Sequence, residues 1–534
     1  MLDHFKAGPS GSNRIASCAV FRDVAAVTLR NRLQLWLIIL LLAVLTSARS
    51  ELVLTNFTTA KPLKIMPIGD SITDDCSLNG AWRLYLQPLL ETNGFPFTFT
   101  GRQLSSPVGT FNKTHHEGYC GTVIAPPGVF AVHGYSTTDA YLLKIVADAM
   151  LITNNRPDVV MLVIGANDIG RGRNPYVVAT NDMPNLLNLI FSNVPNANII
   201  ISKITSLQNA MLNYGPYATN VLIYNAALQS MVNQRRALGQ NVFLSDMFSA
   251  VDYNTMFMAD HVHPNAPGLS AMAKEFLARI QAITIRTNQF TSTVIHGGDS
   301  WKYSDTGEDL GTNWTQTGYD DSAWNTGIAR FGYGDLDIVT TNSYGLDPAN
   351  KFTTTYFRRS FVVPRNMTVT NLNFRLARAD GAAVWLNSQE LFRTNLPGGP
   401  IAYTNLALGM MTGFTSHIYY PTNIAIANSL IGTNQLVVEL HLGSLTNATA
   451  GFDVEVFASG NLIPPPSLSI AQSGGNFVLS WPATNSDGFT LYTRTNIAAG
   501  SWSASAALPV TNAGQIVVTQ LPDASVRFFR LQRP

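Results

Sequence analysis

The stretch at residues 65–75, IMPIGDSITDD, decides the fold prediction because it carries a short apolar run straight into a Gly-Asp-Ser turn. The run LKIMPI, which begins at Leu63, has the length and composition of a buried strand. In open parallel sheets, ligands and reactants gather at the carboxyl ends of the strands. Ser71, which follows this strand directly, is therefore the first candidate for a functional side chain.

Apolar runs and helical patterns alternate outward from this stretch, from residue 63 to about residue 285. Four further runs are typical of strands bounded by turn residues: FPFTFTG, DVVMLVIG, ANIIISKI and NVFLSDM. Between them, residues 137–155 and 217–239 carry apolar residues at helical spacing. This series predicts an α/β domain in which helices cover both faces of a parallel sheet.

Polar residues that follow three of these predicted strands supply the parts of acyl transfer. Ser71 offers a nucleophilic hydroxyl, and Asn167, in the segment GAND, offers an amide that can donate to an oxyanion. Asp260 and His263, in DHVHP, lie three residues apart, so one turn of chain can bring the carboxylate to Nδ1 and leave Nε2 facing the serine. Each motif alone has a structural explanation, such as a capping asparagine or a solvated loop. Their order after strands of one sheet favours a shared active site.

These segments resemble the sequence blocks of the GDSL or SGNH hydrolases over about 220 residues. GDSIT is similar to the first block of that family, GAND to the third and DHVHP to the fifth. The resemblance implies a three-layer, flavodoxin-like SGNH domain with a parallel sheet over residues 61–286. It also implies a serine esterase in which Ser71 is the nucleophile, His263 the base and Asp260 the acid that orients it. Ser71 N–H and the Asn167 amide would be oxyanion donors.

The second block matches less regularly. HHEGYCGTVI, residues 115–124, resembles the HEGYSGW stretch of the family's carbohydrate-esterase branch, which includes acetyl-xylan-esterase-like enzymes. Cys120 stands where serine is usual, and Thr122 replaces the tryptophan. The resemblance implies that Gly118 N–H is a third oxyanion donor. Gly134, in HGYSTTD, is the alternative, and we prefer Gly118 because the residues before it also match the block.

The N-terminal segment has the pattern of a secretory signal. Residues 33–45, LQLWLIILLLAVL, follow the basic residue Arg32 and precede the small residues TSA, which resemble a cleavage site. This apolar run is shorter than the ~20 residues of a membrane-spanning helix. We therefore expect residues 1–48 to be a cleaved signal peptide, with an uncleaved anchor as the alternative. In an oxidising compartment Cys76 and Cys120 can form a disulfide, and two unpaired cysteines are the alternative.

Helical periodicity fades after residue 287, and short alternating runs with aromatic and turn residues replace it. We predict a β-sandwich (jelly-roll) domain over residues 290–460, a proline-rich linker at 461–467 and a small β-sandwich unit at 468–534. Residues 301–334 resemble part of the galactose-binding-like jelly-roll modules, and the last unit resembles fibronectin-type modules. Tryptophans in this half are either sugar platforms or core residues, so no site is assigned to them.

Composition narrows the choice of partners. The chain has 34 Lys and Arg against 33 Asp and Glu, so no broad electrostatic field favours nucleic acid or anionic lipid. The motifs imply no metal and no organic cofactor. The sequence thus predicts a secreted serine esterase acting on O-acyl, preferentially O-acetyl, esters of a polysaccharide, without stable membrane insertion after signal cleavage. The alternatives are a lipid or aryl esterase, lysophospholipase-like, and a glycan-binding surface protein with an inert hydrolase scaffold.

Overall fold

The computed structural model of the protein describes residues 52–74, 76, 78–128, 131, 135–148, 155–205, 217–286, 289–411, 413–484, 486–495, 501–521 and 527–532. The segment predicted to be a signal peptide lies outside this part of the chain. None of the helices within these ranges is both long and apolar enough to cross a bilayer.

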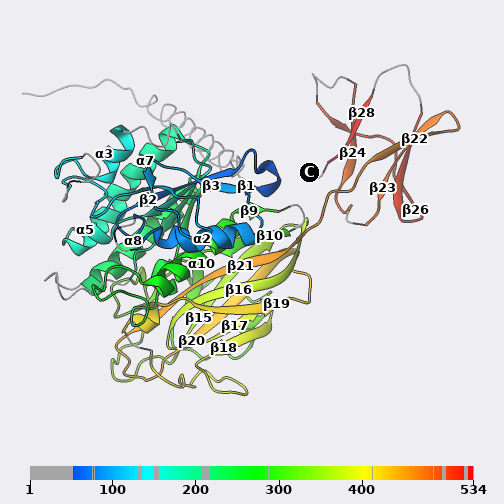
Figure 1. The fold of residues 1–534 in the computed structure, drawn as a ribbon. Coiled ribbons are helices and arrows are strands. Elements are labelled where there is room, and N and C mark those ends of the chain that lie inside the picture. Colours follow the sequence, from blue (N-terminus) through cyan, green and yellow to red (C-terminus); the bar gives the residue numbers. More distant parts are fainter. Residues whose placement is uncertain are drawn as a thin grey trace, which may run out of the picture.

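The first domain is built on a seven-stranded sheet (Figure 1). Its strands are β2 (Leu63–Gly69), β3 (Phe97–Phe99), β4 (Gln103–Leu104), β5 (His115–Gly118), β6 (Val159–Val163), β7 (Asn198–Ser202) and β8 (Val242–Ser245). The order is β4-β5-β2-β6-β7-β8 with β3 also paired to β2, and all pairs are parallel except β4 with β5. Strands β6 and β7 are buried at every position, which explains their continuous apolar runs.

Helices flank this sheet in two layers (Figure 1). The helices are α2 (Ala81–Thr92), α3 (Leu142–Asp148), α5 (Ala166–Gly170), α6 (Pro175–Val177), α7 (Met183–Asn193), α8 (Tyr217–Ala237), α9 (Met247–Ala250) and α10 (Ala266–Ala282). Trp82 of α2 packs on Phe276 of α10 with ring centroids 4.5 Å apart, and α3 packs on α7. The α/β fold predicted for this region is confirmed.

Strand β2 lies between β5 and β6, with Gly69 paired to Gly118 on one side and to Val163 on the other. The chain fills the β5 side of β2 first and then continues with β6 on the opposite side. This arrangement creates a topological switch point at the carboxyl ends of β2 and β6. The residues that follow Gly69 and Val163 consequently share one edge of the sheet.

The second region, which we call the two-sheet domain, spans residues 289–462 and contains two six-stranded sheets. One sheet holds β14 (Thr340–Thr341), β13 (Phe331–Tyr333), β21 (Ala450–Leu462), β16 (Met367–Ala379) and β19 (Tyr420–Ala425), with β10 (Gln289–Ile295) also on β21. The other holds β12 (Asn325–Ile328), β11 (Ser300–Ser304), β15 (Thr354–Val363), β20 (Gly432–His441), β17 (Gly381–Leu386) and β18 (Gln389–Thr394). Phe357 of one sheet stacks on Phe452 of the other at 4.3 Å, so the two sheets share a core.

The last unit contains two smaller sheets and lies apart from the other domains (Figure 1). These sheets are β22 (Ser469–Ser473), β23 (Asn476–Pro482), β27 (Gln515–Gln520) and β26 (Val510–Asn512), and β25 (Ser503–Ala504), β24 (Thr490–Arg494) and β28 (Phe528–Gln532). Its buried core contains Leu479, Trp481, Leu491 and Val518. A separate pair, β1 (Leu52–Val53) and β9 (Thr284–Ile285), joins the two ends of the first domain.

Candidate active site

The turn that follows β2 is fixed by backbone contacts to β6. Asp70 N–H donates to Val163 O at 3.2 Å, and Asp70 Oδ1 accepts from Ile72 N–H at 3.0 Å. A Cβ at Gly69 would lie 2.2 Å from the same Val163 oxygen, so only glycine allows the two strands to approach this closely. A rigid buried strand therefore presents Ser71 at the edge of the sheet.

Ser71, His263 and Asp260 form a continuous hydrogen-bonded chain. His263 Nε2 lies 2.8 Å from Ser71 Oγ, and His263 Nδ1 lies 2.7 Å from Asp260 Oδ2. An ionised carboxylate only accepts hydrogen bonds, so Nδ1 carries the proton and Nε2 is left to accept from the serine hydroxyl. This is the geometry in which an imidazole can take the proton of an attacking hydroxyl.

The carboxylate of Asp260 is held by its own loop. Its Oδ1 accepts from Val262 N–H at 2.9 Å and from His263 N–H at 3.0 Å. Partial burial would raise the pKa of Asp260, but the hydrogen bonds from His263 and Val262 outweigh it and hold the pKa below the usual value. The group therefore stays ionised and keeps the imidazole oriented although its side chain is 41% exposed.

Asn167 lies in α5, which begins directly after the turn that ends β6. Gly165 caps this helix with φ +118°, and a Cβ there would lie 2.7 Å from the Tyr224 hydroxyl oxygen. The Asn167 side chain donates through Nδ2 to Thr122 O at 3.2 Å. The amide thus reaches the loop after β5, next to the switch point.

The predicted role of Gly118 needs correction. Its N–H donates to His116 Nδ1 at 3.0 Å, so this single donor is already used and is not free to bind an oxyanion. The alternative considered from the sequence, Gly134, lies outside the described residues. The sequence alone does not show that the His116 ring accepts this N–H.

Gly121 is the better candidate on the same loop. Its N–H makes no hydrogen bond with the part of the chain that the structure describes, and its φ is +73°. The residue before it, Cys120, donates N–H to Asp74 Oδ2 at 3.2 Å, and the residue after it, Thr122, accepts from Asn167. Gly121 is thereby held between the serine turn and the asparagine; as the second glycine of HEGYCG, it was visible in the sequence.

Cys76 and Cys120 are paired as a disulfide, with Cα atoms 6.2 Å apart. This resolves the open alternative in favour of pairing. The bond joins the segment after Ser71 to the loop that carries Gly121. Arg83, which the sequence analysis missed, braces the same region: it is fully buried in α2 and donates to Thr73 O at 3.0 Å and Thr114 O at 3.1 Å.

Two buried carboxyl groups beside the site have raised pKa values. Burial raises the pKa of Asp70 to about 6 and that of Asp168 to about 7, in the second case against the attraction of Arg173. Asp168 accepts the Ile124 N–H at 3.1 Å and pairs with Arg173. Both carboxyl groups contact loop backbone, Asp70 through the Ile72 N–H, so they brace the loops that surround the nucleophile.

Two groups of side chains in the described residues have the spacing of metal ligands, but neither fits a metal well. In the first, formed by Asp74, Cys76 and Cys120, the two thiols are consumed by the disulfide. The second, formed by Asp335, Asp337 and His417, already contains a cation: the Arg330 guanidinium lies 2.9 Å from Asp337 Oδ2. A second positive charge at that position would be repelled.

The parallel sheet, its switch point and the hydroxyl–imidazole–carboxylate chain define an α/β domain of the serine-hydrolase class. Residues 65–276 match the family described as GDSL-like Lipase/Acylhydrolase. A multidomain esterase from Ruminococcus flavefaciens is 29% identical over 238 residues, which cover 42% of this chain and 29% of that relative. Residues 65–276 thus form a GDSL-like lipase/acylhydrolase domain, and the chain spans less than a third of the length of the Ruminococcus esterase.

Solved structures similar to the chain include two carbohydrate esterases of family 3. The Clostridium thermocellum enzyme is 25% identical, with 40% of this chain and 94% of that chain covered and a TM-score of 0.32. The Talaromyces cellulolyticus enzyme is 22% identical, with 41% and 96% covered and a TM-score of 0.32.

Proposed function

We propose that the protein is a secreted serine esterase that removes O-acyl groups, specifically O-acetyl groups, from a polysaccharide through an acyl-serine intermediate. The observation that carries this proposal is the hydrogen-bonded chain from Ser71 Oγ through His263 to Asp260, at 2.8 and 2.7 Å. The curated relative is named an esterase, which agrees with the reaction class. The polysaccharide substrate rests on the likeness of HHEGYCGTVI to the carbohydrate-esterase block.

In the proposed mechanism, Ser71 Oγ attacks the ester carbonyl carbon while His263 Nε2 takes the hydroxyl proton. The carbonyl oxygen becomes an oxyanion, for which the donors are the N–H groups of Ser71 and Gly121 and the amide of Asn167. The sugar alcohol leaves with the proton from His263. Water then attacks the carbonyl carbon of the acyl-serine and gives a proton to His263. His263 passes this proton to Ser71 Oγ as the carboxylic acid departs.

Export and the nature of the two-sheet domain belong to the same proposal. The apolar run at residues 33–45 with its basic flank supports a cleaved signal peptide. The segment from residue 301 to 334 supports a galactose-binding-like jelly-roll module, and two sheets with a shared aromatic core are compatible with that architecture.

The test compares acetate release from acetylated xylan with turnover of p-nitrophenyl esters of increasing chain length. The wild-type protein should release acetate from the glycan and lose activity as the acyl chain lengthens. Ser71→Ala should abolish both reactions while the fold is retained. Full turnover by Ser71→Ala would refute the mechanism, and a preference for long acyl chains would favour a lipid or aryl esterase instead.

A further inference from the structure

The segment that carries Asp260 and His263 is irregular backbone between α9 and α10, and we call residues 251–265 the catalytic segment. It is tied to itself, with Met258 N–H donating to His263 O at 2.9 Å. The Asp260 carboxylate is held from within the segment, by the N–H groups of Val262 and His263 and by the His263 ring. The segment also packs Met256, Phe257 and Val262 on the core of the first domain. The distance from His263 to Ser71 therefore depends on this packing and on how the two flanking helices are fixed.

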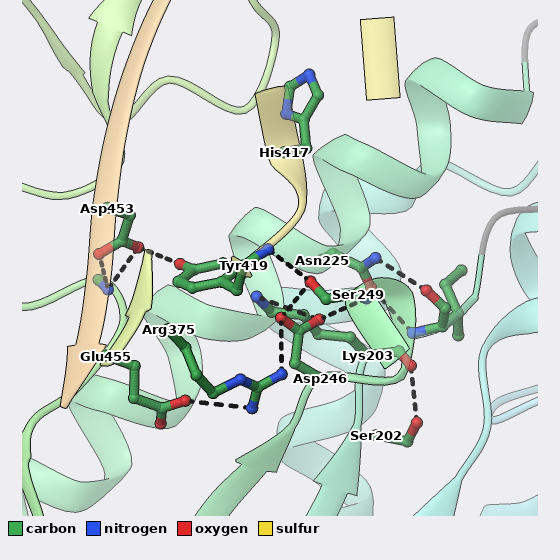
Figure 2. A network of polar contacts seen from close by, with 12 residues as sticks. Ser202, Lys203, Asn225, Asp246, Ser249, Arg375, His417, Tyr419, Asp453 and Glu455 are labelled. Atoms are coloured by element: carbon green, nitrogen blue, oxygen red, sulfur yellow. Dashed lines mark hydrogen bonds and ion pairs between the residues drawn. The ribbon is translucent and has the colours of Figure 1, made fainter. Parts of the chain in front are cut away.

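Helix α9 is attached to the two-sheet domain through Asp246 and Ser249 (Figure 2). Asp246 caps the helix: Oδ1 accepts from Ser249 N–H at 3.2 Å and Oδ2 from Ser249 Oγ–H at 2.7 Å. From the two-sheet domain, Tyr419 N–H donates to Ser249 Oγ at 3.1 Å, and Arg375 Nη2 of β16 lies 3.6 Å from Asp246 Oδ2. Helix α9, which leads into the catalytic segment, is thus anchored to β16 and to the residue before β19 in another domain.

Helix α10 is anchored to β16 and β21 of the two-sheet domain. Glu275 Oε1 accepts from Arg375 Nη1 at 3.0 Å and from Asp246 N–H at 2.9 Å. One turn later, Arg279 forms a two-point ion pair with Glu455 of β21, at 2.6 Å for both bonds. Arg375 therefore contacts the N-cap acid of α9 and an acid in the third turn of α10, and it bridges the two helices.

We call the ionic side chains that connect α9 and α10 to the two-sheet domain the joint. Its charges are balanced and buried. The joint contains three acids and three cations, whose side chains are at most 12% exposed. The acids are Asp246, Glu275 and Glu455, and the cations are Lys203, Arg279 and Arg375. Burial would raise the pKa of Glu275, but Arg375 and Arg279 outweigh it and hold the pKa below its usual value. Removal of Arg375 would leave buried carboxylates undercompensated, and such charges draw in water or move apart.

We propose that Arg375 is a positioning residue for the esterase reaction: the two-sheet domain supplies this guanidinium to fix α9 against α10 and so hold His263 within proton-transfer reach of Ser71. The inference rests on the proposed function. A displacement of about 1 Å at a catalytic group can cost about 10²-fold in rate. The two-sheet domain is then part of the catalytic unit and not only an appended module.

The test uses the full chain and three variants, with a small soluble ester as substrate. Arg375→Met should lower kcat by about 10- to 100-fold and leave KM within about twofold, because the effect acts on proton transfer and not on substrate contacts. Arg375→Lys, which keeps the charge, should recover part of the loss. The matched control is Arg359→Met, because Arg359 pairs with Asp299 at 2.8 Å inside the two-sheet domain and should leave kcat unchanged.

The rate at which a fluorophosphonate labels Ser71 gives a second readout, since it reports how well His263 activates the hydroxyl. It should fall in parallel with kcat in Arg375→Met. A lower melting temperature with wild-type kcat and labelling would overturn the inference and leave the joint a purely stabilising one. Should Arg375→Met not fold, Arg375→Gln, which also removes the charge, takes its place, and wild-type kcat and labelling in that folded variant would overturn the inference equally. Absence of labelling in the wild-type protein would instead refute the proposed function, and the inference with it.

Discussion

The amide of Asn167 is the one proposed oxyanion donor that a side-chain substitution can remove. It is placed by α5, which starts immediately after β6, and it faces Thr122 O on the loop after β5. The other two donors are backbone N–H groups, whose positions follow from the serine turn and from Gly121. A site made mostly of backbone donors depends on loop geometry more than on residue identity.

We predict that Asn167→Ala lowers kcat by about 10²- to 10³-fold with little change in KM, because the lost donor acts on charge that develops only in the transition state. Steady-state kinetics with a soluble acetyl ester gives the measurement. Asn174→Ala is the control: this asparagine caps α6 by accepting Val177 N–H at 3.1 Å and contacts no proposed site residue within the described part of the chain. A similar kcat loss in both variants would contradict the assignment.

The sequence predicts that Ser71, Asp260 and His263 meet because they follow predicted strands, and parallel strands end at one edge. The structure joins these three by hydrogen bonds, whereas the oxyanion role of Asn167 stays a prediction. The choice of Gly121 over Gly118 as the third proposed oxyanion donor depends on the structure. The bond from Gly118 N–H to His116 Nδ1 depends on a side-chain rotamer, which a one-dimensional pattern does not encode.

At the scale of elements, the loop after β5 is irregular but tethered to its surroundings. The disulfide from Cys76 to Cys120 closes a separation of 44 residues. Asp74 adds a second tie by accepting the Cys120 N–H. These tethers hold the loop against the serine turn without help from regular secondary structure.

Replacing both cysteines by serine should cost about 4 kcal/mol of unfolding free energy, because a loop of this length no longer restricts the unfolded chain. It should also lower kcat, since Gly121 lies next to Cys120. Urea unfolding of the double variant, beside the wild-type protein with and without reductant, measures the first effect. Equal stability and equal kcat in all samples would show that the bond is dispensable.

The strands were predictable as elements because buried parallel strands are continuous apolar runs, as at β6 and β7. The hydrogen bonds that Arg83 donates to the loops of the site could not be predicted in this way. In the sequence Arg83 is one arginine in an amphipathic helix, where a solvated charge is the default expectation. Only the tertiary packing turns it into a buried donor to Thr73 O and Thr114 O.

At the scale of the whole molecule, the three units are joined in different ways. The hydrolase domain and the two-sheet domain share the buried ion pairs around Arg375 (Figure 2), whereas the hydrogen bonds of the last unit run within it, as far as the described residues extend. Periodicity and composition predict separate units. They do not reveal a joint made of charges that are scattered between residues 203 and 455.

Deletion of residues 468–534 should therefore leave kcat and KM for a small soluble ester within about twofold of the wild-type values, because distant, unconnected parts of a protein contribute almost independently. The small core of four residues also predicts an early, separate unfolding transition in the full chain that the truncated chain lacks. Calorimetry and kinetics on the two chains provide the comparison. A truncated chain with a large kcat loss would mean that this unit contacts the site.

The contact between the two domains should also respond to pH through Asp453 of β21, because its partner Tyr419 contacts Ser249 of α9. The Asp453 side chain is fully buried, accepts Gly298 N–H at 2.8 Å and accepts the hydroxyl of Tyr419. Burial raises the pKa of Asp453 from 3.8 to about 7, so the folded protein keeps this proton over a range in which the unfolded chain has lost it. The contribution of this group to stability is therefore complete below about pH 4, declines between about pH 4 and pH 7, and is constant above.

Asp453→Asn keeps a neutral side chain with similar shape and hydrogen-bonding atoms but cannot titrate. The unfolding free energy of the variant relative to the wild-type protein should accordingly shift in favour of the variant by a few kcal/mol, to order of magnitude, between about pH 4 and pH 8. Urea unfolding of both proteins at a series of pH values measures this difference directly. A difference that stays constant across the series would mean that Asp453 is ionised in the folded protein throughout, and that the neighbouring cation Lys203 compensates its burial.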